Sequence, residues 1–392
     1  MSRRIRLCIS VCAFIATGLA VLPGTASAAN EVVGTKSASC PNAQFPTIQG
    51  AVNAAPPGST IRICEGVYPE QVTINKALTL AGDSGAEIQP TSMTANTTDP
   101  SSGDGIAAIV LVEDTTDVNI HGLIVDGSMS GLSGCGPDFI GVFYRNASGE
   151  LRRVAVREVE LAPSLNGCQS GSGILVESGS GELSTVDIED SSVHDYQKNG
   201  ITANETGTSV TIVHNVVTGV GPTTGASQNG IQVAFGAGGS ISRNTIANNI
   251  WSPCVSLTNC SDVATDILVD GSDNVTVENN KAGISQIAIA IVANHAHVNN
   301  NVVFDSQIAD GIDLVGNDSD GTNNQITNSS RAGVFVQGNS NDVESNTIDE
   351  AAVGVLEGSG STGNVVANNT IFNAGVKVQD PSTAPLKVSP YR

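Results

Sequence analysis

The densest group of ionisable side chains in the sequence runs from His194 to Asn199, with the order His-Asp-Tyr-Gln-Lys-Asn. A lysine beside a substrate groove can abstract a proton, and a histidine or tyrosine can return one to a leaving oxygen. Lys198 is therefore a candidate general base, with His194, Asp195 and Tyr196 as its candidate partners. The alternative is a polar turn between two strands, in which the lysine is solvated and does no chemistry.

A second group of candidate residues consists of carboxylates. Asp262, Asp266 and Asp270 follow one another at intervals of four, and Asp310 and Asp313 come further along the chain. Carboxylate oxygens are the ligands that calcium prefers, so these residues can hold that ion, with Asp262, Asp266 and Asp270 as the first candidates. Isolated, solvated aspartates are the alternative. Calcium is therefore a possible cofactor, but nothing in the sequence requires a cofactor.

These residues lie within a repeating pattern, which predicts how they are positioned. An aliphatic residue, two positions, an asparagine, one position and a small apolar residue recur six times, around Asn215, Asn244, Asn280, Asn301, Asn346 and Asn369. Five of the repeats are preceded by a Gly-Ile-x-Val type of strand. Because asparagine tolerates the left-handed backbone region and can hydrogen-bond to its own kind along a stack, the pattern predicts a solenoid of roughly ten to twelve coils.

The repeat resembles the right-handed parallel β-helix family that contains pectate lyases, polygalacturonases and pectinesterases. The segment 45–58 has apolar residues at helical spacing and ends at Pro56-Pro57-Gly58, and four short alternating runs follow it. This stretch resembles the N-terminal cap of pectinesterase-like proteins. We therefore expect an all-β, single-stranded, right-handed parallel β-helix solenoid with a short N-terminal capping helix, because the first coil must cover its core and its edge.

The resemblance implies a substrate groove on the outer face of one long parallel sheet. Polar residues at the corresponding strand positions are Asn199, Asn229 and Gln232, which we expect to form a strip across neighbouring coils. Trp251, the only tryptophan, lies near Cys254 and suits stacking on a sugar ring, and packing of its loop against the sheet is the alternative.

Three reactions of the family can be compared with this sequence. The lyases use a base that abstracts a proton next to a uronate carboxylate, which is the role expected of Lys198. Asp310-Gly311-Ile312-Asp313 resembles part of the polygalacturonase signature, in which paired carboxylates hydrolyse the glycosidic bond, but the Asp-Asp, Gly-His-Gly and Arg-Ile-Lys parts are missing. The run 138–141 resembles part of a pectinesterase site without its glutamines or its arginine and tryptophan.

The charge balance restricts the possible partners. The 392-residue chain has 17 basic and 38 acidic residues, a net charge of −21, which argues against nucleic acid as a partner. A polyanionic glycan would be repelled unless a cation bridged it, whereas a neutral glycan would not. Only 3% of the residues are aromatic, and glycine is abundant, as in stacked short strands and turns.

Residues 1–28 have the features of a secretory signal peptide: early arginines, an apolar run and Ala26-Ser27-Ala28 before the expected cleavage. No later segment approaches the length of a membrane span. The six remaining cysteines suit an oxidising compartment, and neighbour pairing, the simplest of the possible connectivities, joins Cys40 to Cys64, Cys135 to Cys168 and Cys254 to Cys260.

We therefore expect a secreted, extracellular monomer with a cap and first coils at 29–90, β-helix coils at 91–376 and a C-terminal tail at 377–392. We expect it to act on or bind extracellular polysaccharide. The leading hypothesis is a polysaccharide lyase-like enzyme that uses the Lys198 region. The alternative is a non-catalytic glycan-binding or cell-surface structural module, which the scarcity of basic residues in the coils favours.

Overall fold

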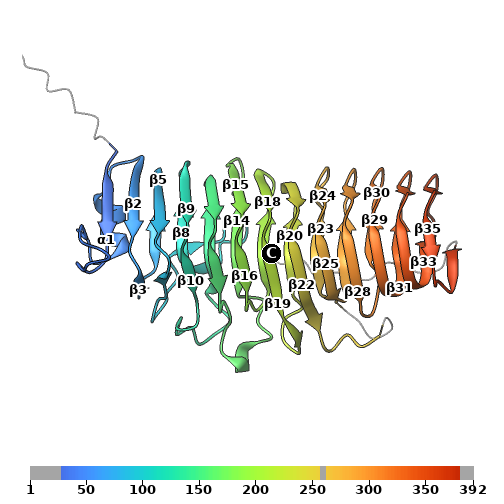
Figure 1. Ribbon diagram of the computed structural model, residues 1–392, viewed down its shortest axis with the longest axis horizontal. Helices are drawn as coiled ribbons and strands as arrows, with labels where there is room; N and C mark the ends of the chain where they lie inside the picture. The colour runs from blue at the N-terminus through green and yellow to red at the C-terminus, as the bar shows by residue number, and fades with distance from the viewer. Residues whose placement is uncertain (1–27, 257–261, 380–392) are drawn as a thin grey trace, which may run out of the picture.

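Strands, most of them three to six residues long, stack into the coils of a right-handed parallel β-helix (Figure 1). The computed structural model describes residues 28–256 and 262–379. The predicted signal peptide and most of the predicted tail lie outside these residues. Within the described part of the chain no helix is long and apolar enough to cross a membrane.

One face of the solenoid, face A, is a 13-stranded parallel sheet with one strand from each successive coil. Its members, in order, are β1 (Asn30–Val33), β2 (Ser59–Ile63), β5 (Leu78–Gly82), β9 (Val118–His121), β12 (Gly149–Arg152), β15 (Ser184–Glu189), β18 (Thr208–Val213), β21 (Gly238–Ser242), β24 (Thr276–Glu278), β27 (His297–Asn299), β30 (Asp320–Thr322), β32 (Asp342–Glu344) and β34 (Val365–Ala367).

A second, 23-stranded sheet forms the two other faces. Face B contains β4 (Val72–Ile74), β8 (Gly105–Glu113), β11 (Asp138–Arg145), β14 (Ser172–Glu177), β17 (Asn199–Asn204), β20 (Asn229–Ala234), β23 (Thr265–Asp270), β26 (Ile287–Val292), β29 (Ile312–Val315) and β36 (Val376–Gln379). Face C contains β3 (Gly66–Tyr68), β6 (Ala86–Ile88), β10 (Ile124–Asp126), β13 (Ala155–Arg157), β16 (Ser192–His194), β19 (Val216–Thr223), β22 (Thr245–Trp251), β25 (Lys281–Ser285), β28 (Val302–Ser306) and β35 (Thr370–Phe372). Two long strands, β31 (Gln325–Gln337) and β33 (Thr347–Glu357), bend from face C into face B. The remaining strand, β7 (Thr97–Thr98), pairs antiparallel with β8.

The core is a set of apolar columns that run along the axis. On face B, Ile174, Ile201, Ile231, Ile267, Ile289, Ile312, Val334 and Val355 are in parallel register and fully buried. Parallel neighbours lie about 4.8 Å apart, so each side chain packs on the same kind of side chain in the next coil. Because residues alternate across a strand, the next residue of each strand lies on the outer face of the sheet.

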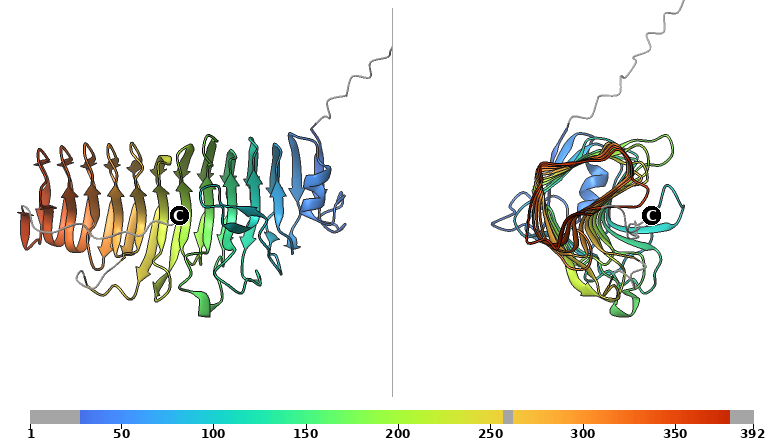
Figure 2. Two further views of the ribbon diagram at one scale, coloured as in Figure 1. Left: turned by 180° about the vertical axis from the view of Figure 1, so that it is seen from behind. Right: turned by 90° about the vertical axis from the view of Figure 1, so that its right-hand side faces the viewer.

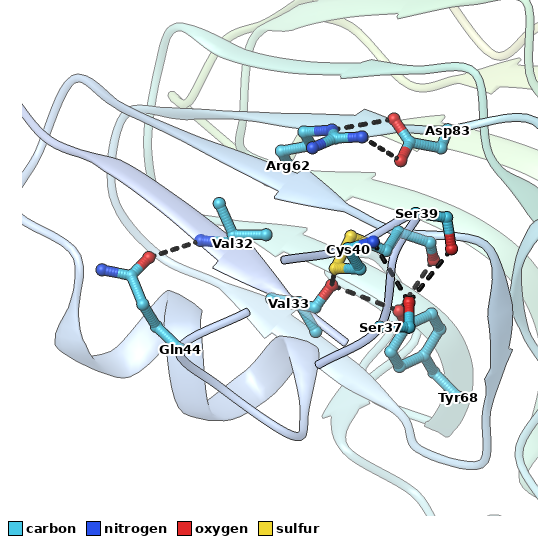
Figure 3. Close-up of a disulfide and its surroundings, with 10 residues drawn as sticks. Val32, Val33, Ser37, Ser39, Cys40, Gln44, Arg62, Tyr68 and Asp83 are labelled. Atoms are coloured by element: carbon cyan, nitrogen blue, oxygen red, sulfur yellow. Dashed lines mark hydrogen bonds and ion pairs between the residues drawn. A yellow bond between two sulfur atoms is a disulfide. The ribbon is translucent and has the colours of Figure 1, made fainter. Parts of the chain in front are cut away.

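The N-terminal end is covered as the sequence predicts. Helix α1 (Ile48–Ala54) begins after Thr47, whose hydroxyl accepts a hydrogen bond from the Gly50 amide, and it buries Ile48 and Val52. In the view along the axis, α1 lies within the outline of the coils (Figure 2). The disulfide between Cys40 and Cys64 fastens this cap, and Tyr68 lies beside it (Figure 3). The Tyr68 hydroxyl donates to the Cys64 carbonyl at 2.7 Å.

Two of the three predicted disulfides are confirmed, Cys40–Cys64 and Cys135–Cys168. Cys254 is also disulfide-bonded, and its predicted partner Cys260 lies outside the described residues.

The predicted asparagine ladder is confirmed and has a seventh member. From Asn244 onward, each ladder asparagine accepts hydrogen bonds from the asparagine one coil before it, whereas the first, Asn215, accepts from the Ser191 amide; the side-chain nitrogen of each donates to a carbonyl in the same direction. The members are Asn215, Asn244, Asn280, Asn301, Asn324, Asn346 and Asn369. The sequence pattern did not identify Asn324, because Gly321 occupies the position at which the other repeats have an aliphatic residue.

The expectation that these asparagines adopt the left-handed conformation is wrong, because the residue before each of them adopts it instead. The residue with positive φ is the one before each ladder member, for example His214 (φ 57°), Asn279 (φ 58°) and Asn300 (φ 57°). That residue makes the turn, and the turn then directs the following asparagine inward. The ladder residue itself is selected for its amide group.

Candidate functional site

Three neighbouring connections from strands of face C into face B project from one side of the central coils (Figure 1). They are the first loop (158–171, between β13 and β14), the second loop (224–228, between β19 and β20) and the third loop (252–264, between β22 and β23), of which 257–261 are not described. These connections interrupt the otherwise short turns of the solenoid, and loops of this kind on a rigid scaffold often carry function.

Two glutamines hold the first and third loops in the same way. Gln197 donates to the carbonyls of Leu165 and Cys168 at 2.9 Å each and accepts from the Leu161 amide at 3.0 Å. Gln286 donates to the carbonyls of Trp251 and Cys254 at 2.9 and 3.0 Å. Both glutamines come shortly before a strand of face B, so the rigid sheet fixes the base of each loop.

The second loop is held by a lysine and by its neighbours. The Lys198 ammonium donates to the Ser227 carbonyl at 2.6 Å, and the Trp251 indole N–H donates to the Gly225 carbonyl at 2.8 Å. The Ala226 amide donates to the Asn166 carbonyl of the first loop at 2.8 Å. A Cβ atom on Gly225 would lie 2.2 Å from that carbonyl oxygen, so only glycine permits this approach of the two loops.

A cleft of about 430 Å³ opens between the first loop and the end of β19. Its lining combines amides, hydroxyls, prolines and one carboxylate: Glu160, Leu161, Pro163, Asn166, Gln197, Val220, Pro222, Thr223 and Thr224. Burial, reinforced by the nearby charges of Asp195 and Glu158, raises the pKa of the Glu160 carboxyl. The sequence did not indicate Glu160, Asn166, Thr223 or Thr224, because the loops that carry them do not follow the repeat.

The residues predicted as a catalytic cluster, from His194 to Lys198, do not share one environment. His194 and Asp195 are partly exposed and pair with each other, the ring Nδ1 lying 2.6 Å from the carboxylate. Tyr196 is fully buried in the core, where its hydroxyl donates to Asn249 Oδ1 at 2.6 Å. Asp195 has φ 53°, and this left-handed turn sends the residues on either side of it in different directions.

The prediction of a solvated lysine is wrong, because Lys198 has no exposed surface. Removal from water lowers the pKa of its ammonium to about 8, and the nearby Asp262 carboxylate partly opposes this effect. A lysine with such a pKa is suited to proton transfer, although in this structure its nitrogen serves the Ser227 carbonyl. The predicted catalytic role of Lys198 therefore stays a prediction.

The predicted substrate-binding strip is a hydrogen-bonded network on the outer face of face B. Asn199 donates to Thr202 at 3.0 Å and to Gln232 at 3.1 Å, and Asn229 donates to Asn199 at 3.3 Å. Thr265 donates to Asn229 at 2.8 Å. Asn199, Asn229 and Gln232 are brought together as expected, but all are buried and bonded to protein groups.

Trp251 packs one coil beyond that strip, because its buried cluster includes Leu268, the register partner of Gln232 on β23. Its ring packs against the buried cluster of Cys254, Leu268 and Ile287, which matches the alternative of a loop packed on the sheet, and it stays partly exposed.

The three predicted calcium ligands are not brought together. Asp266 and Asp270 lie at opposite ends of β23, and Asp266 is fully buried where Asn249 donates to it at 2.8 Å. Burial raises the pKa of the Asp266 carboxyl to about 7. In the described ranges no group of three or more His, Cys, Asp or Glu side chains can hold a metal ion.

The two carboxylates of the Asp-Gly-Ile-Asp segment do lie together, and they have a cationic partner. Asp310 and Asp313 are buried on the outer side of face B, and Arg331 of the next coil binds Asp310 with its Nε at 2.7 Å. Burial and the neighbouring Asp310 raise the pKa of Asp313. The arginine was not predicted as a partner, although its distance in sequence equals one coil.

Comparisons with known proteins agree with the fold. A family model described as "Periplasmic copper-binding protein (NosD)" matches residues 184–388. Similar solved structures include the A-module of the Azotobacter vinelandii mannuronan C-5 epimerase AlgE4 (17% identity, TM-score 0.55, 88% of this chain and 95% of the module). The GH136 lacto-N-biosidase from Eubacterium ramulus is 10% identical, with TM-score 0.59 over 88% of this chain and 68% of the enzyme.

The periplasmic alginate epimerase AlgG is 13% identical, with TM-score 0.53 over 83% of each chain. At these identities the similarity to solved structures concerns the fold alone. No curated protein sequence matches the chain.

Proposed function

The chain belongs to the NosD family, and we propose that this member binds an extracellular polysaccharide without cleaving it. The family is described as periplasmic copper-binding, and its model matches more than half of the chain. The family description and the disulfides agree with a periplasmic or extracellular protein. The proposed binding site is the cleft between the first loop and the end of β19.

One observation carries this proposal: the composition and the rigid support of the cleft. Hydroxyl and amide groups of Thr223, Thr224 and Asn166 can exchange hydrogen bonds with sugar hydroxyls, and the prolines offer apolar surface to the ring faces. Gln197 fixes the cleft wall through three hydrogen bonds, so little ordering is required when a ligand binds.

The charge around the cleft favours a neutral glycan. Glu160 lines it, and Glu158 and Asp195 lie close enough to influence the pKa of Glu160. The whole chain has a net charge of −21. A polyuronate would be repelled by this surface in the absence of a bridging cation, whereas a chain of neutral sugars has no such penalty.

Copper, which the family description implies, does not fit the described residues. Copper sites use imidazole, thiolate or thioether ligands. Cys40, Cys64, Cys135, Cys168 and Cys254 are all disulfide-bonded. His194 and His297 each pair with an aspartate, and no group of three metal-binding side chains occurs in residues 28–256 and 262–379. The proposed function therefore does not involve copper.

A lyase is the second candidate function, and one observation favours it. Lys198 is a buried amine with a pKa lowered to about 8, and its neighbour Gln197 lines the cleft. Such an amine is partly neutral near neutral pH and can accept a proton. Against this candidate, the Lys198 nitrogen is occupied by the Ser227 carbonyl and has no exposed surface.

The experiment is a panel of neutral and uronate polysaccharides incubated with the mature protein, with calcium or with chelator. Binding is followed by affinity electrophoresis, and cleavage by ultraviolet absorbance of unsaturated ends and by reducing ends. Thr224→Trp should fill the cleft and weaken binding of a neutral glycan at least tenfold. Thr211→Trp, on the exposed side of face A, is the matched control.

Retention of a neutral glycan without new ends supports the proposal. New ends with rising absorbance replace it with the lyase. Equal binding by the two tryptophan variants would show that the cleft is not the site.

A further inference from the structure

The corner at which face C turns towards face B has one residue in an unusual conformation. Ile284, with φ 58°, is the one β-branched residue with positive φ in the described part of the chain. That conformation is a genuine outlier for a β-branched side chain, whereas Asn248, Asp305 and Asn328, at the same corner of neighbouring coils, are of types that tolerate it. Burial does not explain the isoleucine, because 37% of its surface is exposed. Residues held in such conformations cluster at active sites and ligand-binding sites.

An aromatic ring lies beside this isoleucine on the outer side of face C. A Cβ atom on Gly283, the register partner of Phe304, would be 2.7 Å from two atoms of the Phe304 ring, so the ring occupies space that only glycine leaves open. The ring stays partly exposed, and Val302, two positions earlier, is 40% exposed. The Lys281 ammonium lies over the ring, 5.3 Å from its centroid. Such a contact is weak at an exposed site, so a ligand can displace the ammonium.

These residues continue the cleft along the axis of the solenoid. Val220, which lines the cleft at β19, is 39% exposed. Asn248 follows on β22 and donates to the Gly219 carbonyl at 3.1 Å, and Ile284 and Phe304 follow on β25 and β28. Because β19 pairs with β22, β22 with β25 and β25 with β28, the path covers about 14 Å along the axis (Figure 1). We call Val220, Asn248, Ile284 and Phe304 the track.

The track differs in charge from face A. The outer side of face A carries a series of carboxylates: Glu150, Asp187, Glu189, Glu278, Asp320, Asp342 and Glu344. The track itself has none, and the first carboxylate beyond Ile284 at the same corner is Asp305, which accepts from Asn328 at 2.7 Å. In a chain with a net charge of −21, an apolar and amide-bearing strip of this kind suits an uncharged ligand.

We propose that a neutral polysaccharide held in the cleft continues over the track, with a sugar ring stacked on Phe304. This inference rests on the proposed function and extends it, because it makes the ligand a polymer that crosses several coils and not a short oligosaccharide. Ile284 and Phe304 offer apolar surface to the ring faces, and the Asn248 side-chain oxygen can accept from a sugar hydroxyl. The displaced Lys281 ammonium can donate to another hydroxyl.

Binding measurements with polymers and short fragments test the track. The polymers are laminarin, galactomannan and hydroxyethyl cellulose, followed by affinity electrophoresis, and the fragments are laminaritriose, mannotriose and cellotriose, followed by calorimetry. Phe304→Ala should weaken the binding of a polymer that the natural protein retains by about tenfold and leave the binding of its trisaccharide unchanged. Phe372→Ala is the matched control, since Phe372 is 50% exposed on the same face three coils further along, beyond the track.

Ile284→Asn separates a binding role from a structural one. Asparagine tolerates the left-handed conformation, so this variant should have a higher urea midpoint than the natural protein. It should nevertheless bind the polymer less tightly, because the apolar contact with the sugar is lost. A lower midpoint with unchanged polymer binding would make Ile284 a structural residue and overturn the proposal.

The two proposals fail in different ways. If the natural protein binds neither the polymers nor the trisaccharides, the proposed function fails and this inference fails with it. If a trisaccharide binds and Thr224→Trp weakens that binding, the cleft is the glycan site. In that case, equal polymer binding by Phe304→Ala and Phe372→Ala would overturn the track alone.

Discussion

Arg331 and Asp310 form a buried ion pair between two successive coils, in which the guanidinium Nε donates to Oδ1 at 2.7 Å. The Ala332 amide donates to the same oxygen at 3.0 Å, and the guanidinium also lies over Phe335. The pair therefore fixes one coil on the next, beside the buried carboxyl of Asp313 and the ring of Phe335.

Removing the arginine should destabilise the protein strongly. Arg331→Met leaves the Asp310 carboxylate buried without its cation, which typically costs about 3–5 kcal/mol. The double variant Arg331→Met with Asp310→Asn should recover most of that loss, since no uncompensated charge remains. Urea unfolding followed by circular dichroism measures both variants, and equal stability of the single variant and the natural protein would contradict a structural ion pair.

Asp266 should make the protein less stable as the pH rises. Its pKa is about 7 in the folded protein, against an ordinary value of 3.8, so the folded state binds the proton more tightly than the unfolded state. The stabilisation is complete below about pH 4 and declines up to about pH 7, by up to about 4 kcal/mol. Asp266→Asn has no titrating group at this position, so the stability of the natural protein relative to the variant should fall over this pH range.

The measurement for Asp266 is the urea midpoint of both proteins at pH 4.5 and pH 8. Other carboxyls such as Glu177, whose burial raises its pKa to about 8, contribute equally to both proteins and cancel in the comparison. A variant that keeps the full pH dependence would show that Asp266 is ionised in the folded protein.

Lys198 should have the opposite pH dependence. Its pKa falls from 10.5 to about 8 on folding, so the folded state loses this proton first and becomes more stable as the pH rises from about 8 to about 10.5. The stability of Lys198→Met relative to the natural protein should therefore be highest at pH 7 and lowest at pH 10. The same variant should retain glycan binding while the second loop becomes more sensitive to protease, because its hydrogen bond to Ser227 is lost.

The asparagine ladder should be more sensitive in its middle than at its end. Asn301 donates to Val277 and Asn324 and accepts from Asn280, all in a buried environment. Asn301→Ala leaves several of these groups without partners, at about 1–3 kcal/mol each. Asn369 is only partly buried and ends the described ladder, so Asn369→Ala should cost less than half as much. Equal losses in thermal unfolding would argue against a cooperative ladder.

The sequence determined the fold of this protein because the relevant signals are local and repeated. The aliphatic-to-asparagine spacing, the Gly-Ile-x-Val strands and the helix before Pro56 each need only a few residues, and the structure confirms all three. Asn324 was missed where a single glycine broke the pattern. The two confirmed disulfides followed from proximity along the chain.

The tertiary structure alone decided which residues face one another at the site. His194 and Tyr196 are two residues apart in sequence, yet the turn at Asp195 leaves His194 partly exposed and buries Tyr196. The cleft arises from Glu160 and Thr223 on different coils, brought together by loops that obey no repeat. A repeating sequence specifies the rise from coil to coil, but the direction of a side chain at an irregular corner depends on backbone angles and loop packing that no periodic pattern encodes.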